Sequence, residues 1–80
     1  MITGVQIRAA CAMLKWTIRD LSARSGVSWG STQRIVSADG VPPVNARYIV
    51  AIQETLEAAG VVFLMPGDTR PGGYGVRMKG

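Results

Sequence analysis

The sequence predicts a mainly α fold, in which four helices are followed by a C-terminal β-hairpin. Apolar residues recur at helical spacing through the first sixty residues, with a capping residue ahead of each stretch. After Gly60 the pattern changes to short segments of β-branched or alternating apolar residues. We therefore expect residues 1–60 to form a helical unit and residues 61–80 to form a hairpin of the same compact unit.

The first two helices have clear starting signals. Thr3 and Gln6 match a capping box and predict a helix over residues 4–14. A second threonine precedes a shorter helix over residues 18–25, and Gly26 follows where a helix end favours positive φ. The apolar face of the first helix consists of Ile7, Ala10 and Leu14.

The third and fourth helices are separated by a proline-containing break. Ser28 can cap a third helix that runs through Ile35 and ends before residues 39–43, which read DGVPP. Asn45 can cap a fourth helix, which Gly60 ends. The fourth helix has the most regular apolar spacing, at Ile49, Ile52, Leu56 and Ala59.

The last twenty residues predict two strands and the loop between them. Residues 61–65 are apolar throughout, whereas residues 75–79 alternate, with Val76 and Met78 expected to face inward. Between these segments, residues 66–73 contain turn-forming residues and no core residues, so we expect a flexible hairpin loop.

Composition limits the possible functions of the chain. It has 48% hydrophobic and 18% charged residues, which is typical of a folded domain, and a domain this small gains stability from forming oligomers. Nine basic and five acidic residues give a net charge of +4, which favours a nucleic acid or another polyanion as partner. Seven of the nine are arginine, which suits contacts with phosphate and guanine, although GC-rich coding produces the same excess.

The rare residue types exclude several classes of chemistry. Cys11 is the only cysteine, so the chain forms no internal disulfide, and its apolar surroundings indicate a buried thiol. The absence of histidine leaves no plausible zinc site and no acid–base pair, so we expect no enzyme, metal or cofactor. No apolar run is long enough to span a membrane and no signal peptide is visible, so a cytoplasmic protein is expected.

Only Gly26 and Val27 separate the second and third predicted helices. This short glycine-containing turn is typical of a helix-turn-helix motif, here over about residues 18–36, whose second helix enters the DNA major groove. The segment IRAACAMLKWTIRDLSARSGVSWGSTQRI, residues 7–35, resembles the XRE (Cro and phage-repressor type) family of bacterial transcriptional regulators. The resembling core and turn positions are Leu14, Trp16, Leu21, Gly26, Val27, Ser28 and Ile35.

The resemblance extends to residues 45–78, which look like the tail of a compact subgroup with a C-terminal hairpin. It implies a DNA-binding repressor, or repressor-activator, that dimerises through this tail, with a recognition helix at about residues 28–36. The chain departs from the family pattern at Ile18, Ser22 and Thr32, where members usually have glutamine, alanine and isoleucine. We expect the Thr32 hydroxyl to donate to the carbonyl of Ser28.

The predicted DNA contacts fall into two sets. On the outer face of the third helix, the residues expected to contact bases are Ser28, Trp29, Gly30, Gln33 and Arg34. At or near helix starts, the residues expected to contact phosphate are Thr17, Arg19, Ser31, Asn45 and Arg47. Lys15 and Arg24 are weaker candidates for phosphate contacts.

A homodimer on double-stranded DNA with an inverted repeat is the expected assembly, with edge strands or hairpins exchanged between subunits. Its predicted interface consists of Val61, Phe63, Met65, Val76 and Met78. Two alternatives stay open: Trp29 as a partly buried anchor against the second helix or the subunit interface, and the whole chain as a protein-binding module on the same fold, such as an antitoxin or anti-activator. Ile18, in place of the usual glutamine, and Asp20 near the expected DNA face keep the second alternative open.

Overall fold

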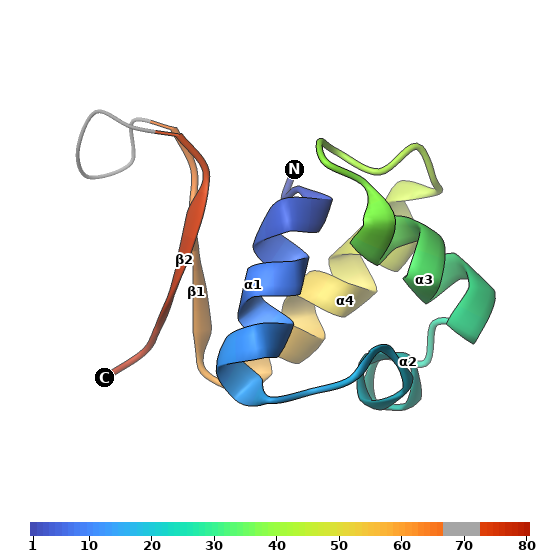
Figure 1. Cartoon of the computed structure of the whole chain (residues 1–80), viewed down its shortest axis with the longest axis horizontal. Coiled ribbons are helices and arrows are strands. Elements are labelled where there is room, and N and C mark those ends of the chain that lie inside the picture. Colours follow the sequence, from blue (N-terminus) through green and yellow to red (C-terminus); the bar gives the residue numbers. More distant parts are fainter. Residues whose placement is uncertain (67–72) are drawn as a thin grey trace.

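The computed structural model describes residues 1–66 and 73–80, and it confirms four helices followed by a hairpin (Figure 1). The helices are α1 (Gly4–Leu14), α2 (Ile18–Ser25), α3 (Trp29–Ser37) and α4 (Ala46–Ala58). Strand β1 (Val61–Leu64) pairs antiparallel with β2 (Gly75–Met78). Most of the predicted flexible loop, residues 67–72, lies outside the described residues.

Side chains at the helix starts explain where α1 and α2 begin. The Thr3 hydroxyl accepts from the amide of Gln6 at 3.2 Å, and the Gln6 Oε1 accepts from the amide of Thr3 at 2.8 Å. Thr17 and Asp20 form the same reciprocal pair at the start of α2, at 3.1 and 2.9 Å. Both capping boxes satisfy amides that a helix leaves without an internal partner. The predicted capping of both helices is confirmed.

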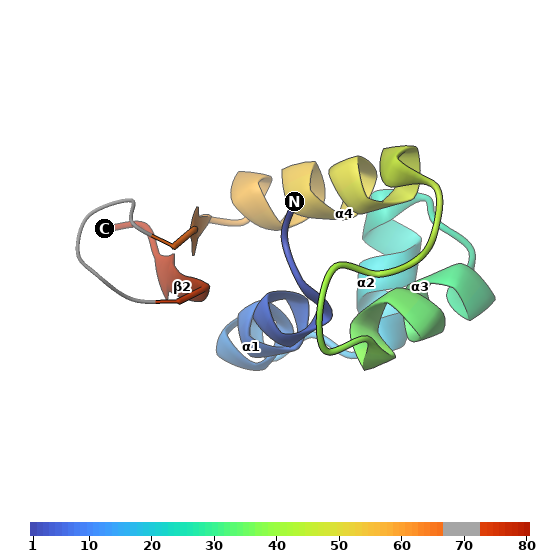
Figure 2. The same cartoon turned by 90° about the horizontal axis from the view of Figure 1, so that it is seen from above.

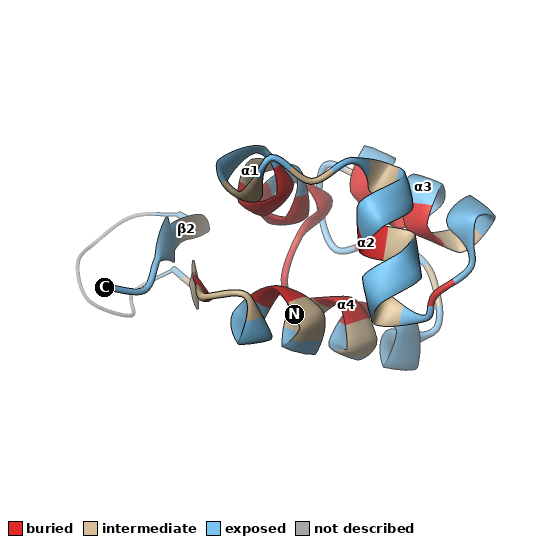
Figure 3. Ribbon diagram, turned by 90° about the horizontal axis from the view of Figure 1, so that it is seen from below, coloured by how far each residue is buried: buried red, intermediate tan, exposed pale blue. Residues whose placement is uncertain are grey.

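The buried faces of the four helices meet in one core (Figure 3). Its fully buried large side chains are Ile2, Ile7, Leu21, Ile35, Ile49, Ile52, Leu56 and Thr32. Cys11 is buried as predicted, and this burial raises the pKa of its thiol above the usual value. Trp16, predicted for the core, is only partly buried and lies at the edge of the core. None of the described helices has the length and apolar character needed to cross a membrane.

The N-terminus of α1 packs closely against the end of α3. The amide of Gly4 donates to the carbonyl of Gly40 at 3.0 Å, and a Cβ atom at residue 4 would lie only 1.9 Å from the carbonyl oxygen of Ala38. Arg8 donates to the carbonyls of Val36 and Ala38 at 2.7 and 3.1 Å. These contacts fix the end of α3 on α1, and none of them was predicted from the sequence.

The hairpin packs one face against the helices. In its register Phe63 faces Val76, and both pack against the core, while Val61 is buried within it. Contacts link β2 to α1 and β1 to α4. The Gln6 side-chain amide also donates to the carbonyls of Leu64 and Gly75, at 3.1 and 2.9 Å. The hairpin is therefore joined to the helical core by both apolar and polar contacts.

The long axis of the molecule separates the hairpin from α3. The Cα atoms extend over 35 × 27 × 18 Å. Figure 1, which sets the longest axis horizontal, shows the hairpin at one end and α3 at the other. The hairpin and α3 are therefore separated along the longest dimension of the molecule.

Candidate nucleic-acid interface

The turn between α2 and α3 is tight and internally bonded. Gly26 has φ +76° and its amide donates to the carbonyl of Ser22 at 3.0 Å, which ends α2 in the left-handed region that glycine tolerates. Val27 then enters the core with 4% of its surface exposed. These residues lead the chain directly into α3.

Two hydroxyl groups stabilise this turn from opposite helices. The Thr32 hydroxyl donates to the carbonyl of Ser28 at 2.8 Å, as predicted, and also lies 3.3 Å from the carbonyl oxygen of Val27. The Ser22 hydroxyl donates to the same Val27 carbonyl at 2.6 Å. The two hydroxyls that depart from the family pattern therefore share an acceptor, which offsets the cost of placing them in a largely apolar region.

The inner and outer faces of α3 are clearly separated. Thr32 and Ile35 are completely buried and Val36 nearly so, which directs these residues into the core. The residues predicted to contact bases are all exposed: Ser28, Trp29, Gly30, Gln33 and Arg34. The structure thus brings this whole set together on the start and outer face of one helix.

Gly30 leaves open space on the outer face of α3. Apart from its own turn of helix, a Cβ atom built on Gly30 would meet no heavy atom of the described residues within 4 Å. The glycine is therefore not required by packing within the chain, although glycine weakens a helix by about 1 kcal/mol relative to alanine. Because glycine has no side chain, the helix backbone is left exposed beside Arg34.

Trp29 borders α2 yet remains accessible. Nearly half of its surface, 48%, is exposed. Together with Arg19, Ser22 and Ala23 it lines an open hollow of about 430 Å³ between α2 and the first turn of α3. The indole is therefore not a buried anchor in the single chain.

Four of the five residues predicted to contact phosphate lie at two helix starts. Thr17 and Arg19 are exposed at the start of α2. Asn45 and Arg47 are exposed at the start of α4, where the Asn45 side chain accepts from the amide of Arg47 at 3.0 Å. Figure 2 shows this start of α4 at the same end of the molecule as α3. Ser31 is half-buried within α3.

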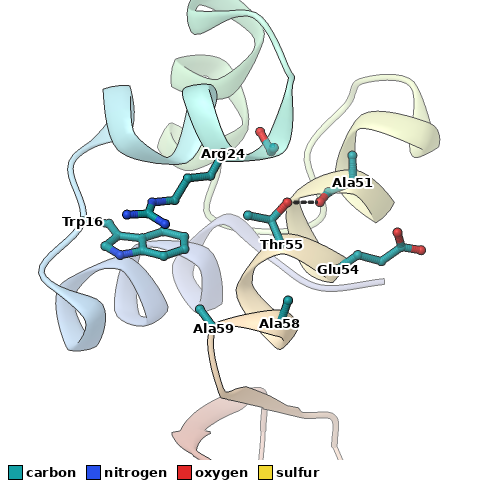
Figure 4. A pocket seen from close by; sticks show the side chains of 8 residues that line it. Trp16, Arg24, Ala51, Glu54, Thr55, Ala58 and Ala59 are labelled. Carbon is teal, nitrogen blue, oxygen red and sulfur yellow. Dashed lines mark hydrogen bonds between the residues drawn. The ribbon is translucent and has the colours of Figure 1, made fainter.

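Arg24 lies elsewhere. Its guanidinium carbon is 4.5 Å from the centre of the Trp16 ring, in a cation–π contact (Figure 4). Both side chains line an open pocket of about 600 Å³ whose other wall is α4, including Glu54 and Thr55. Arg24 is therefore directed toward α4 and is not part of the outer face of α3.

The charges around α3 are mainly positive and unpaired. The one ion pair within the described ranges joins Arg8 to Asp39 at 3.3 Å, so Arg19, Arg34 and Arg47 have no acidic partner there. Asp20 is the acidic residue of the motif. Hydrogen bonds from Thr17 lower the pKa of its carboxyl group, which therefore stays ionised at neutral pH while it caps α2.

The predicted dimer-interface residues occupy a different environment from the one expected. Val61, Phe63, Met65 and Val76 pack within or against the core of their own chain, and only Met78, at 40%, is substantially exposed. The opposite face of the hairpin consists of Val62, Leu64, Gly75 and Arg77. A dimer that keeps this fold would use that outer face or the strand edges. In β2 the alternation placed Val76 inward, as found, whereas residues 61–65 are apolar throughout and gave no such signal.

Sequence reasoning also missed the residues that hold α3 in place. Gly4 and Arg8 belong to α1, and they contact the end of α3 more than twenty-five residues later in the chain. Only the presence of a glycine in the first turn of a helix hinted at a close approach.

Comparisons with known protein families, with curated proteins and with solved structures found no match. The α3 surface is therefore interpreted from its own residues. Its features are a tight glycine turn, a buried inner face and an exposed outer face with a glycine, an amide and an arginine.

Proposed function

We propose that this chain is a sequence-specific DNA-binding transcriptional regulator that reads an inverted repeat as a homodimer. The observation that carries the proposal is the outer face of α3, where Trp29, Gly30, Gln33 and Arg34 are all exposed. The short glycine turn that precedes α3 is of the kind found in helix-turn-helix motifs. An α-helix of this kind fits the major groove of B-DNA. The net charge of +4 supports a polyanionic partner.

The outer face offers groups that match base edges. Arg34 can donate two hydrogen bonds to guanine O6 and N7, and Gln33 can address adenine N6 and N7, each pair contributing about 1–3 kcal/mol of discrimination. Gly30 lets the helix backbone approach the bases because no side chain stands between them. The same face contains no acidic side chain, so it does not repel the phosphates that border the groove.

Selection from a pool of random duplexes tests sequence recognition. The regulator should enrich a motif with two-fold symmetry, and fluorescence anisotropy at several salt concentrations should show tighter binding to that motif than to a scrambled duplex. Equal affinity for both duplexes would remove sequence-specific regulation from consideration.

Two arginine variants separate base contacts from phosphate contacts. Arg34→Ala should relax the preference at one base position of the selected motif. Arg47→Ala should weaken binding to all duplexes alike and reduce the slope of log affinity against log salt by about 1. If Arg34→Ala leaves the preference profile unchanged, α3 does not read bases in this orientation.

The position of the hairpin restricts how two copies can share one duplex. The two-stranded sheet presents one face to α1 and α4, at the opposite end of the long axis from α3 (Figures 1 and 2). Packing two outer hairpin faces together would separate the α3 helices by nearly twice the 35 Å length of one chain and point them in opposite directions.

Pairing along a strand edge gives a different result. A two-fold axis normal to the sheet leaves both α3 helices at the same end, with the chains side by side across a width of 18–27 Å. Two α3 helices at the same end can both approach one duplex, which a dimer that reads two half-sites requires. Since the sheet has two strands within the described residues, each strand has an unpaired outer edge. We therefore favour dimerisation through a strand edge.

Analytical ultracentrifugation at micromolar concentration tests the dimer, which should sediment at twice the mass of the chain. Half-sites in the selected motif should have centres about 10 base pairs apart. A monomeric mass in both the absence and presence of the duplex would contradict the homodimer.

The exposed Trp29 supports a second candidate function, a protein-binding module. A half-exposed tryptophan beside a hollow is a common anchor in protein–protein interfaces. Under this alternative, the chain would bind random and selected duplexes equally weakly, and Trp29→Ala would leave that weak binding unchanged.

A further inference from the structure

The hollow between α2 and α3 brings together two side chains that the sequence assigns to different roles. Arg19, from the first turn of α2, and Trp29, from the first residue of α3, line the same space of about 430 Å³. Its remaining lining residues are small, Ser22 and Ala23. The hollow therefore has a cationic side, an aromatic side and a wall without long side chains.

The polar groups of the hollow limit what it can recognise. The Ser22 hydroxyl already donates to the carbonyl of Val27 at 2.6 Å, so its proton is not available to a base. The indole has one N–H donor and cannot make the paired hydrogen bonds that distinguish base pairs. Arg19 has no acidic partner within the described residues, so its guanidinium is free to bind an anion.

We propose that this hollow holds one sugar–phosphate unit of the DNA strand that borders the major groove. This inference rests on the proposed DNA-binding function and refines it. The deoxyribose packs on the indole of Trp29, and its phosphate accepts hydrogen bonds from the guanidinium of Arg19. Trp29 is then a positioning residue that sets the depth and register of α3, and base discrimination belongs to Gln33 and Arg34.

A double-mutant cycle on a random-sequence duplex tests whether Arg19 and Trp29 act on the same group. A random duplex is the appropriate probe because sugar and phosphate are the same in every sequence. In the otherwise unmodified chain, Arg19→Ala should weaken binding about tenfold, the loss expected for one charge-assisted hydrogen bond. In a Trp29→Ala background the same substitution should cost about threefold or less, since the sugar is no longer held beside the arginine.

Arg47→Ala is the matched control, because Arg47 is an exposed arginine that does not line the hollow. It should weaken binding by the same factor with and without Trp29. Trp29→Phe should restore most of the coupling to Arg19, since phenylalanine keeps a flat apolar ring. Thermal unfolding of each variant checks that the fold is retained.

Fluorescence gives a second measurement of the same contact. The chain has two tryptophans, so a Trp16→Phe variant leaves Trp29 as the only strong emitter. Addition of the random duplex should shift its emission to shorter wavelength and reduce quenching by acrylamide.

The outcomes distinguish the inference from the function on which it rests. Two results would overturn the proposed sugar–phosphate site while DNA binding stands. In the first, the duplex binds but Arg19→Ala weakens binding by the same factor with and without Trp29. In the second, the duplex binds but acrylamide quenches Trp29 as strongly as in the free chain. If the unmodified chain binds no duplex even at low salt, both the proposed sugar–phosphate site and the proposed function are overturned.

Discussion

The two faces of α3 differ sharply in what surrounds them. On the inner face, Thr32 and Ile35 are fully buried, and their polar and apolar atoms have partners in the same chain. On the outer face, a Cβ atom added to Gly30 would point into space that no other segment of the described chain occupies within 4 Å, and Gln33 and Arg34 are exposed. The inner face is determined by folding, whereas the outer face has residue types that folding does not require.

This difference separates residues that the stability of the free chain requires from residues that it does not require. A glycine that fills no tight space and adopts no positive φ costs helix stability without a gain in the free chain. By contrast, the glycine at residue 4 is required by the approach of α1 to the end of α3. The two glycines should therefore respond to substitution in opposite ways.

Among substitutions that disturb the packing of α3, Gly4→Ala should lower the free energy of unfolding most. Its Cβ atom would lie 1.9 Å from the carbonyl oxygen of Ala38 and 2.8 Å from that of Ile35, and backbone atoms cannot move aside as a flexible side chain can. The free energy of unfolding, measured by urea denaturation, should fall by about 3 kcal/mol. Gly40→Ala is the matched control, because among the described residues only its chain neighbours approach its Cβ position within 4 Å, and it should change stability little. Equal effects of both substitutions would show that the α1–α3 approach is looser than described.

The shared acceptor in the α2–α3 turn should give the next largest effect. Ser22→Ala and Thr32→Val each leave one hydroxyl within reach of the Val27 carbonyl, but the double variant leaves none. The double variant should therefore lose about 1 kcal/mol more than the sum of the two single losses. Additive losses in chemical denaturation would mean that the two hydroxyls act independently.

Gly30→Ala, on the outer face of α3, should change the free energy of unfolding less and in the opposite direction. Alanine fits the open space and should stabilise α3 by up to about 1 kcal/mol, visible as a higher unfolding midpoint. Under the proposed function the same methyl group would hold the helix away from the bases and weaken specific binding. A variant that is more stable and binds the selected motif as well as before would contradict close backbone approach.

The capping carboxylate of α2 should give the smallest effect, confined to acid. Because its hydrogen bonds with Thr17 lower the pKa of Asp20 in the folded chain, the carboxylate stabilises the fold above its unfolded pKa, and this contribution is lost as the pH falls through the folded pKa. The stability difference between the unmodified chain and Asp20→Asn should therefore be present near pH 7 and shrink toward about pH 3. If the stability difference between the two chains does not vary with pH, the charge of the Asp20 carboxylate does not stabilise the fold.

Local signals explain most of what the sequence could predict. Thr3, Thr17, Ser28 and Asn45 each sit at the helix start that their short polar side chains suggest, because capping depends on residues only two or three positions away. The outer face of α3 follows equally from helical periodicity. Contacts between distant segments were not accessible in this way. The role of Gly4 depends on Ala38, and the face of the hairpin that is covered depends on how α1 and α4 are placed.

The side-chain amide of Gln6 makes the C-terminal strands part of the N-terminal helix cap. Its oxygen accepts from Thr3, while its nitrogen donates to carbonyls 58 and 69 positions later in the chain. Truncation after α4 would remove both acceptors and leave the amide hydrogens to water or unsatisfied, and an unsatisfied buried group costs about 1–3 kcal/mol. The hairpin is therefore not a detachable appendage, and the shortened chain would lose stability throughout its helices.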